Sequence, residues 1–541
     1  MKKHLYLAIA VLAFSLIVNS SQAQDNPLFR HISPEASGVY HINLPLLASK
    51  ISWADLMTRI PLEKMKSKNQ QWLALVMDPA QTGVDFKSDI LITTSDDPMG
   101  SFTTVILHLT DTSKFRISLR KQLHGVRISR YPDKSYSAFK GTTGAAWNKD
   151  FAVLVIIKPS APEGSGNGSK SPNYEAMTVS KSIHALKGWD SSPLTNDPAF
   201  KEAFSNDADF QMYTEKTNYY KGLDKVFPHG LMNSFHWDSL LLYKNSYCGL
   251  WFSNGKMTAH CVTVMKPDVA EELAKLPPPA VNPDLLAHVP KGNLLGLASI
   301  RFNPGLIPFL LNRIGLGHMV DSALSSENVR VEDLAAAFKG DLLMAAIEPD
   351  QTDSTQKSQG HKPAIYTAIS INDPSALRKW TDMLGKKKDS LYMPSPDGSG
   401  DSVKRVTPIG KLKHQYVVKD NILLFSGNKA LAEGYFANTE KRNTDAELIE
   451  NMKANPVFLW INMGEIVNFL LGPVRSDDGG DSKMKMLNGL HVLDKFIITK
   501  SAIHDGKITT DVEFSVTKKD QNFLKTIFDL IPESKPKAPQ H

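Results

Sequence analysis

The chain has 541 residues, with 62 lysines and arginines against 56 aspartates and glutamates, and a formal net charge of +6 at pH 7. So small an excess, without a block of basic residues interleaved with aromatic ones, argues against nucleic acid as a partner. The length suffices for two domains of roughly 250 residues, each large enough to bury its own core.

The first residues have the pattern of a secretory signal peptide. Two lysines precede the apolar residues 5–18, and Ser21 and Ala23 are the small residues that a signal peptidase reads. The apolar run is shorter than the roughly 20 residues of a membrane-spanning helix. We therefore expect a signal peptide at residues 1–23, cleaved between Ala23 and Gln24. The mature protein is then exported, as a periplasmic, envelope-associated or secreted protein without a transmembrane segment.

The mature chain contains an ordered internal repeat. Four segments of the first half recur in the same order in the second half: 34–43 in 290–303, 104–111 in 366–373, 209–214 in 457–462, and 254–258 in 505–509. This order predicts two copies of one structural unit. We place them at residues 24–276 and 284–531, joined by the linker 277–283 and succeeded by a disordered tail at 532–541. The linker begins with three prolines, which are stiff and continue neither a helix nor a central strand.

Strands and helices alternate within each predicted unit. Ser37–Asn43 and Leu294–Phe302 are typical of strands, and each leads into a stretch with helical spacing of apolar residues. Asp111 and Asp373 stand where helices should begin, and aspartate is a favourable N-cap. The predicted fold class is α+β, with two similar tandem domains that each consist of a mainly antiparallel sheet and packed helices.

One aromatic-rich segment is a candidate for ligand contact. Residues 213–237 include Tyr219, Tyr220 and Phe227, which are possible ligand-contacting residues. Aromatic side chains at such spacing more often pack in a core. Both interpretations stay open from the sequence.

The two cysteines are predicted to form a disulfide. Asn254-Gly255 is a strong signal for a two-residue hairpin turn. Cys248 and Cys261 lie equally far from that turn, at a non-hydrogen-bonded pair where Cα atoms approach to about 4.5 Å. An exported chain meets an oxidising environment. The alternative is two buried free thiols.

Several short segments resemble a known family: the opening 34–44, the turn Asp78–Asp85, the strand entry Phe338–Leu343 and the segment Trp460–Gly464. They resemble DUF4836, a family of exported Bacteroidetes proteins, over most of the mature chain. The resemblance implies an exported or envelope location. It implies no catalytic residues, because that family carries no assigned activity.

No motif identifies a chemistry. Residues 164–171 resemble a phosphate-binding loop, but Ser169 separates the last glycine from the lysine. His229 and His236 lack the spacing of a zinc site, and the acidic loop 476–482 lacks the ligand pattern of a calcium loop. There is no Gly-x-Ser-x-Gly elbow. From the sequence we predict no catalytic, metal-binding or cofactor-binding residue, and we favour a protein that is not an enzyme.

Three classes of function remain. The first, which we favour, is a non-catalytic binding or envelope-assembly protein. The second is a secreted hydrolase with a site between the two units, and the third is a carrier of a lipid or another apolar ligand. The expected partner is an envelope protein, a glycan or an apolar ligand. A pocket lined by convergent carboxylates favours the enzyme, whereas a dry apolar cavity favours the carrier.

Overall fold

The computed structural model describes residues 26–52, 82–97, 99–122, 125–159, 173–189, 192–215, 242–289, 292–325, 328–348, 363–379, 415–426, 429–437, 446–471 and 489–530. The chain divides into two compact units: unit 1 comprises residues 1–216, 245–261 and 518–541, and unit 2 comprises 217–244 and 262–517. This division differs from the predicted units 24–276 and 284–531. The chain passes between the units at residues 216/217, 244/245, 261/262 and 517/518, and the proline-rich segment 277–283 lies inside unit 2.

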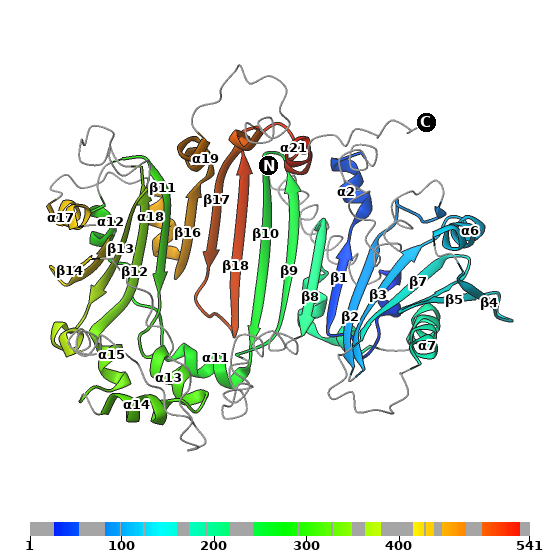
Figure 1. Ribbon diagram of the computed structural model, residues 1–541, viewed down its shortest axis with the longest axis horizontal. Helices are drawn as coiled ribbons and strands as arrows, with labels where there is room; N and C mark the ends of the chain where they lie inside the picture. Colours follow the sequence, from blue (N-terminus) through cyan, green and yellow to red (C-terminus); the bar gives the residue numbers. More distant parts are fainter. Residues whose placement is uncertain are drawn as a thin grey trace, which may run out of the picture. The chain divides into compact units, whose positions relative to one another are not determined.

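Unit 1 contains an antiparallel sheet with the strand order β4-β5-β6-β7-β3-β2-β1-β8-β9 (Figure 1). Its strands are β1 (Gly38–Ile42), β2 (Ile90–Asp97), β3 (Gly100–His108), β4 (Arg127–Arg130), β5 (Tyr136–Lys140), β6 (Thr143–Trp147), β7 (Phe151–Pro159) and β8 (Phe210–Glu215), with β9 (Tyr243–Ser253) from residue 245 on. The next strand, β10 (Lys256–Met265), pairs with β9 and belongs to unit 1 as far as residue 261. Its helices are η2 (Pro27–His31), α2 (Leu44–Lys50), α6 (Thr112–Gln122), α7 (Tyr174–Lys187), α8 (Pro193–Asn196), α9 (Pro198–Ala203) and α21 (Phe523–Asp529).

Unit 2 contains a second antiparallel sheet, with the order β14-β15-β13-β12-β11-β16-β17-β18. Its strands are β11 (Leu294–Arg301), β12 (Phe338–Ile347), β13 (Ala364–Ile371), β14 (Gln415–Lys419), β15 (Ile422–Ser426), β16 (Val457–Asn462), β17 (Leu493–Lys500) and β18 (Lys507–Val516). Its helices are α11 (Pro267–Ala274), α12 (Asp284–Ala287), α13 (Leu306–Arg313), α14 (Gly317–Ser325), α15 (Val331–Ala337), α17 (Lys429–Ala437), α18 (Ala446–Ala454), α19 (Met463–Leu471) and η5 (Leu490–Val492).

The succession of paired strands is the same in both units. The order β6-β7-β3-β2-β1-β8-β9 in unit 1 matches β14-β15-β13-β12-β11-β16-β17 in unit 2. The match agrees with the ordered sequence repeat, although two tandem copies of one domain stay a prediction. The predicted α+β class, with a mainly antiparallel sheet and packed helices, is confirmed.

Local sequence signals explain where several elements begin. The strands predicted at 37–43 and 294–302 are β1 and β11. Asp111 Oδ1 accepts hydrogen bonds from the amides of residues 113 and 114, and Asp373 Oδ1 accepts them from the amides of residues 375 and 376. Both aspartates therefore satisfy the free N–H groups of a helix start, as predicted.

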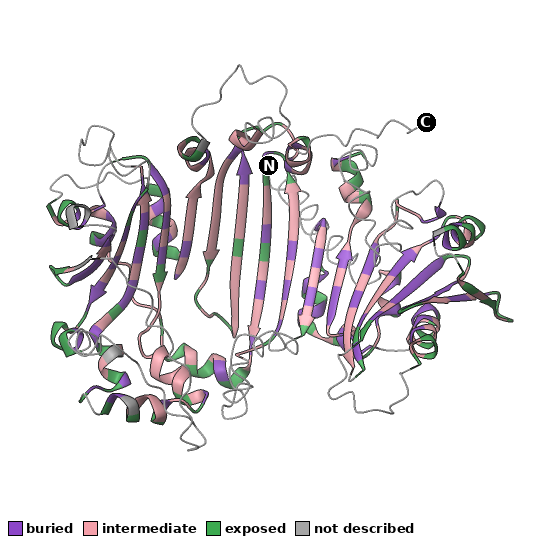
Figure 2. Ribbon diagram, in the orientation of Figure 1, coloured by how far each residue is buried: buried purple, intermediate pink, exposed green. Residues whose placement is uncertain are grey.

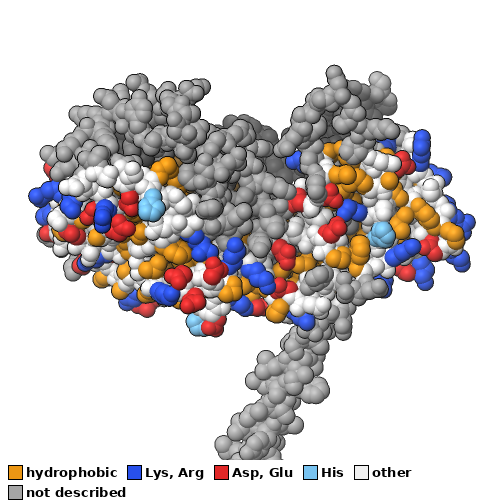
Figure 3. Space-filling model, turned by 90° about the horizontal axis from the view of Figure 1, so that it is seen from below, with side chains coloured by type: hydrophobic (Ala, Val, Ile, Leu, Met, Phe, Trp, Pro, Cys, Tyr) orange, Lys and Arg blue, Asp and Glu red, His pale blue; other side chains and the backbone are white. Residues whose placement is uncertain are grey.

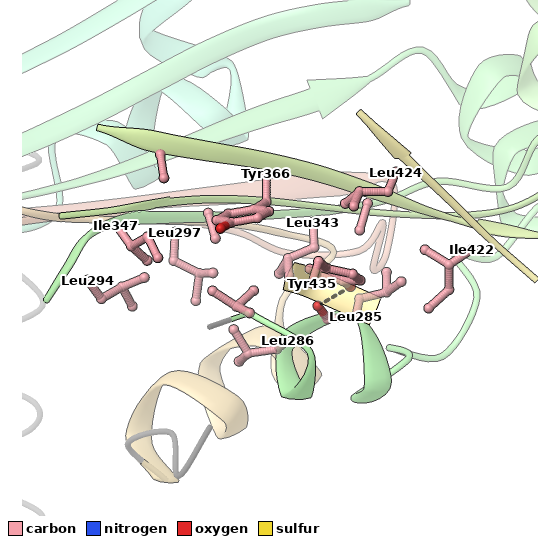
Figure 4. Close-up of a cluster of buried hydrophobic side chains, with 14 of the residues drawn as sticks. Leu285, Leu286, Leu294, Leu297, Leu343, Ile347, Tyr366, Ile422, Leu424 and Tyr435 are labelled. Carbon is pink, nitrogen blue, oxygen red and sulfur yellow. Dashed lines mark hydrogen bonds between the residues drawn. The ribbon is translucent and has the colours of Figure 1, made fainter. Parts of the chain in front are cut away.

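Each unit has its own buried core. In unit 1, β6 is buried along its whole length, and Trp147 at its end contacts Phe115 of α6 with ring centroids 5.5 Å apart. In unit 2, side chains from the sheet meet α12 and α17, and Tyr435 donates a hydrogen bond of 2.7 Å to the carbonyl of Leu285 (Figure 4). By contrast, β17 and β18 are of intermediate burial almost throughout (Figure 2).

Charged side chains of both signs are interspersed over the described part of the face in Figure 3. The predicted signal peptide at residues 1–23 and the predicted tail at 532–541 lie outside the described residues. Of the helices in the described ranges, none combines the length and the apolar character needed to cross a bilayer.

Candidate functional site

An apolar pocket of about 230 Å³ lies within unit 1. It is lined by Leu44, Leu47, Ala48, Ile51, Phe86, Phe252, Leu524 and Phe528. These residues come from α2 and its C-terminal end, the loop before β2, the strand β9 and the helix α21. All eight side chains are hydrocarbon, so the pocket offers its occupant no side-chain hydrogen bond.

The first wall is one face of α2. Leu44, Leu47, Ala48 and Ile51 have the i, i+3, i+4, i+7 spacing that brings side chains to one side of a helix. The helix begins where Asn43 Oδ1 accepts a hydrogen bond of 2.9 Å from the amide of residue 46. No residue of α2 itself is buried, so the stripe stays partly exposed along the helix, and only Ile51 at its end is buried.

The second wall is α21, which lies far from α2 in the sequence. Asn522 Oδ1 caps this helix by accepting from the amide of Leu524, and its Nδ2 donates to the carbonyl of Phe252 at 3.0 Å. Leu524 and Phe528 are one helical turn apart and line the pocket, while Phe523 stacks on Phe252 with ring centroids 6.3 Å apart. One asparagine therefore both starts the helix and fixes it to β9.

A buried carboxylate connects two parts of the pocket wall. Asp209 is 0% exposed and accepts hydrogen bonds from Lys50 Nζ at 2.6 Å and from the amide of Phe252 at 2.6 Å. Lys50 is the last residue of α2, and Phe252 lies on β9. The carboxylate therefore holds the end of α2 near the strand that carries Phe252.

A buried histidine, His41 on β1, contacts a glutamine and an aspartate in the same unit. His41 Nδ1 lies 2.8 Å from Gln211 Oε1, and His41 Nε2 lies 2.9 Å from Asp89 Oδ2. Gln211 is itself held, because its Nε2 donates to the carbonyl of Asn206 at 2.6 Å. A general base needs a ring nitrogen that faces the proton to be abstracted. Both nitrogens of His41 are engaged by Asp89 and Gln211, and neither of these side chains is a nucleophile that His41 could activate.

A second buried histidine is held in one tautomer. Arg30 Nε donates to His31 Nε2 at 3.2 Å, so His31 Nδ1 carries the proton and donates to the carbonyl of Ala185 at 2.6 Å. Burial lowers the pKa of His31 below its ordinary value of 6.5, and the nearby Arg30 charge lowers it further. His31 is 1% exposed, so its two hydrogen bonds contribute to the packing of unit 1.

Cys248 and Cys261 are joined by a disulfide, with Cα atoms 4.0 Å apart, across the hairpin of β9 and β10. The turn differs in detail from expectation. Gly255 has a positive φ of +70°, but Asn254 does not, whereas Asp505 and Gly506 at the corresponding turn of unit 2 both do. Asn254 forms a bridge with Asn522, and the Gly255 amide donates to the carbonyl of Gln521. The turn of unit 1 therefore contacts the segment before α21, and its conformation differs from that of the turn at Asp505 and Gly506.

The remaining predicted site residues fall in two stretches of the chain. Tyr219, Tyr220 and Phe227, and the cleavage position at Ala23 and Gln24, lie outside the described residues. In the described ranges, no group of three or more histidine, cysteine, aspartate and glutamate side chains is arranged to hold a metal ion. Sequence reasoning missed the apolar pocket. The helical spacing of residues 44–51 was a usable signal for one wall, but nothing in the sequence indicated its partner.

Comparison with known proteins gives no family. No family model and no curated protein matches this chain. Solved structures of TP0453 in crystal forms IV, III and I are similar to it at TM-scores of 0.29, 0.28 and 0.27, with 8%, 6% and 11% sequence identity. The alignments cover 44%, 47% and 44% of this chain and 81%, 88% and 80% of those chains. TM-scores this low support no conclusion about the fold or the function of this chain. Membership of DUF4836 stays a prediction.

Proposed function

We propose that this chain is a non-catalytic binding protein of the cell envelope or the extracellular space, and that the pocket of unit 1 binds an apolar group of its ligand. The observation that carries the proposal is the all-hydrocarbon lining of that pocket. Burial of apolar surface is the main favourable contribution such a pocket can make to binding. Export is supported by the Cys248–Cys261 disulfide, because such bonds persist in oxidising compartments.

The size of the pocket limits the ligand. Its volume of about 230 Å³ lies below the range that begins at about 300 Å³ for drug-sized ligands. It exceeds the engineered apolar cavity of about 150 Å³ that binds benzene. The pocket therefore suits a short alkyl segment or a single aromatic ring, such as the end of an acyl chain, and not a whole lipid.

The proposal is tested by calorimetric titration of the mature protein with butanol, hexanol and octanol. We expect the affinity to rise by about fourfold for each methylene, as the burial of hydrocarbon predicts, until the pocket is full. An affinity that does not depend on chain length contradicts the proposal.

A pair of variants locates the binding site. Leu47→Gln places a polar group in the pocket and should weaken octanol binding, whereas Ile117→Gln should leave it unchanged. Ile117 is the matched control, because it is an apolar residue of the same unit that lies on α6 and is 61% exposed. Thermal melting of both variants shows that they are folded. Equal octanol affinity in the two variants excludes this pocket as the site.

A further inference from the structure

A larger cavity, of about 640 Å³, lies within unit 2. It is lined by the segment 279–283, the loop 303–305 after β11, Ala335 of α15, three residues of the first part of β12, and Asn372. The volume falls within the range typical of small-molecule sites. The cavity shares no residue with the pocket of unit 1, so a ligand bound here is independent of the proposed function.

The cavity contains a buried carboxylate with an unused oxygen. Asp341 on β12 is 3% exposed and lines the cavity. Its Oδ2 accepts a hydrogen bond of 2.9 Å from Ser370 Oγ, which in turn accepts one of 3.0 Å from Asn282 Nδ2. Its Oδ1 has no hydrogen-bond partner among the described residues, and neither has Nε of its cross-strand neighbour Arg301. Buried polar atoms in native proteins are almost always paired, so this oxygen keeps the capacity to accept one more hydrogen bond.

Positive charge on the protein balances this carboxylate. Arg301 is the cross-strand partner of Asp341, and the two attract each other electrostatically. Its guanidinium also donates to the carbonyls of Pro279 and Lys453, at 3.0 and 2.8 Å. The exposed side chain of Lys339 lines the cavity as well. With cationic groups already present, the site does not require a positively charged ligand to balance Asp341, and a neutral donor suffices.

The remaining walls are apolar or rigid. Three prolines, Pro279, Pro283 and Pro304, and the ring of Phe338 present C–H surface to the cavity. The loop with Pro304 is held by Asn303, whose Oδ1 accepts from the amide of residue 305 and whose Nδ2 donates to the carbonyl of residue 277. A neutral molecule that carries both hydroxyl donors and a flat C–H face matches these walls.

We propose that the cavity of unit 2 binds a saccharide. In this arrangement a sugar hydroxyl donates to Asp341, and the C–H face of the sugar ring packs on Phe338 and the prolines. The hydrogen-bonded chain from Asn282 through Ser370 holds the carboxylate in place before binding, which reduces the entropy lost when the ligand is fixed.

The experiment is titration of the mature protein with the methyl glycosides of glucose, galactose, mannose and N-acetylglucosamine, monitored by saturation-transfer NMR and calorimetry. At least one glycoside should bind at millimolar concentration or below. Asp341→Asn should weaken it by about 10- to 100-fold, as expected for a lost hydrogen bond to a charged group. The control is Asp420→Asn, which removes an exposed carboxylate of the same unit at a position whose φ of +53° suits asparagine.

A second variant keeps the test decisive if Asp341→Asn does not fold. Ala335→Phe leaves the hydrogen-bonded chain of Asp341 intact and places bulk in the cavity, so it should abolish glycoside binding. The proposal is overturned if none of the four glycosides binds, or if glycoside affinity is the same in wild type and in whichever of these two variants folds. It is also overturned if putrescine binds and the glycosides do not, because the site then selects a cation.

Discussion

Replacement of Asp209 by alanine tests how strongly one carboxylate holds the apolar pocket together. The side chain is fully buried and accepts hydrogen bonds from Lys50 Nζ and from the amide of Phe252, each at 2.6 Å. Removal of one member of a buried ion pair costs about 3–5 kcal/mol. Because the Lys50 side chain is 17% exposed, its ammonium can turn towards water, and we expect the lower value, about 3 kcal/mol. Asp209→Asn keeps an acceptor for the Phe252 amide and should lose about 2 kcal/mol.

The assay is a double-mutant cycle in urea. The free energy of unfolding of unit 1 is measured for wild type, Asp209→Asn, Lys50→Met and the double variant, with a probe specific to that unit. We expect a coupling energy of about 2 kcal/mol. The control cycle uses Lys181 and Glu35, whose side chains are 2.8 Å apart but 29% and 64% exposed, and it should give less than about 1 kcal/mol. If the Asp209 and Lys50 variants are additive within about 0.5 kcal/mol, the buried pair does not hold α2 in place.

Three further predictions concern stability. The folded-state pKa of His31 lies below 6.5, so the contribution of neutral His31 to stability is fully present above pH 6.5 and falls as the pH drops below it. His31→Gln should therefore reduce the dependence of the melting temperature on pH between about pH 7.5 and 5. An unchanged dependence contradicts this. The variant with alanine at positions 248 and 261 lacks the disulfide, which closes a short loop. Its free energy of unfolding in denaturant titration should be about 3 kcal/mol lower than that of the wild type. Equal stability of variant and wild type refutes this. Gly340 has a φ of +91°, and a Cβ at this position would meet the carbonyl oxygen of Phe302. Gly340→Ala should therefore lower the free energy of unfolding by about 2 kcal/mol in the same titration. A change near zero argues against strain at this position.

Sequence reasoning succeeded where the determinants are local. The hairpin turn and the equal spacing from it located the pairing of Cys248 with Cys261, and the aspartates before two helices act as caps because a cap acts on the next few amides. It failed where the determinants are distant. The face of α2 could be recognised by its period, but the partner helix α21 lies at the other end of the described chain. The cross-strand pair of Arg301 and Asp341 depends on the register of β11 with β12, which the sequence did not specify.

The assembly of the pocket in unit 1 from α2 and α21 has a consequence for biosynthesis. A ribosome makes the residues of α2 more than 400 residues before those of α21, so the wall formed by α2 lacks its partner during that interval. At roughly 5–20 residues per second, that interval lasts on the order of half a minute or more. Throughout it, the stripe of Leu44, Leu47 and Ile51 has no α21 to face. Nascent unit 1 therefore lacks one wall of the pocket until α21 is made, and a chain terminated before residue 523 never acquires that wall.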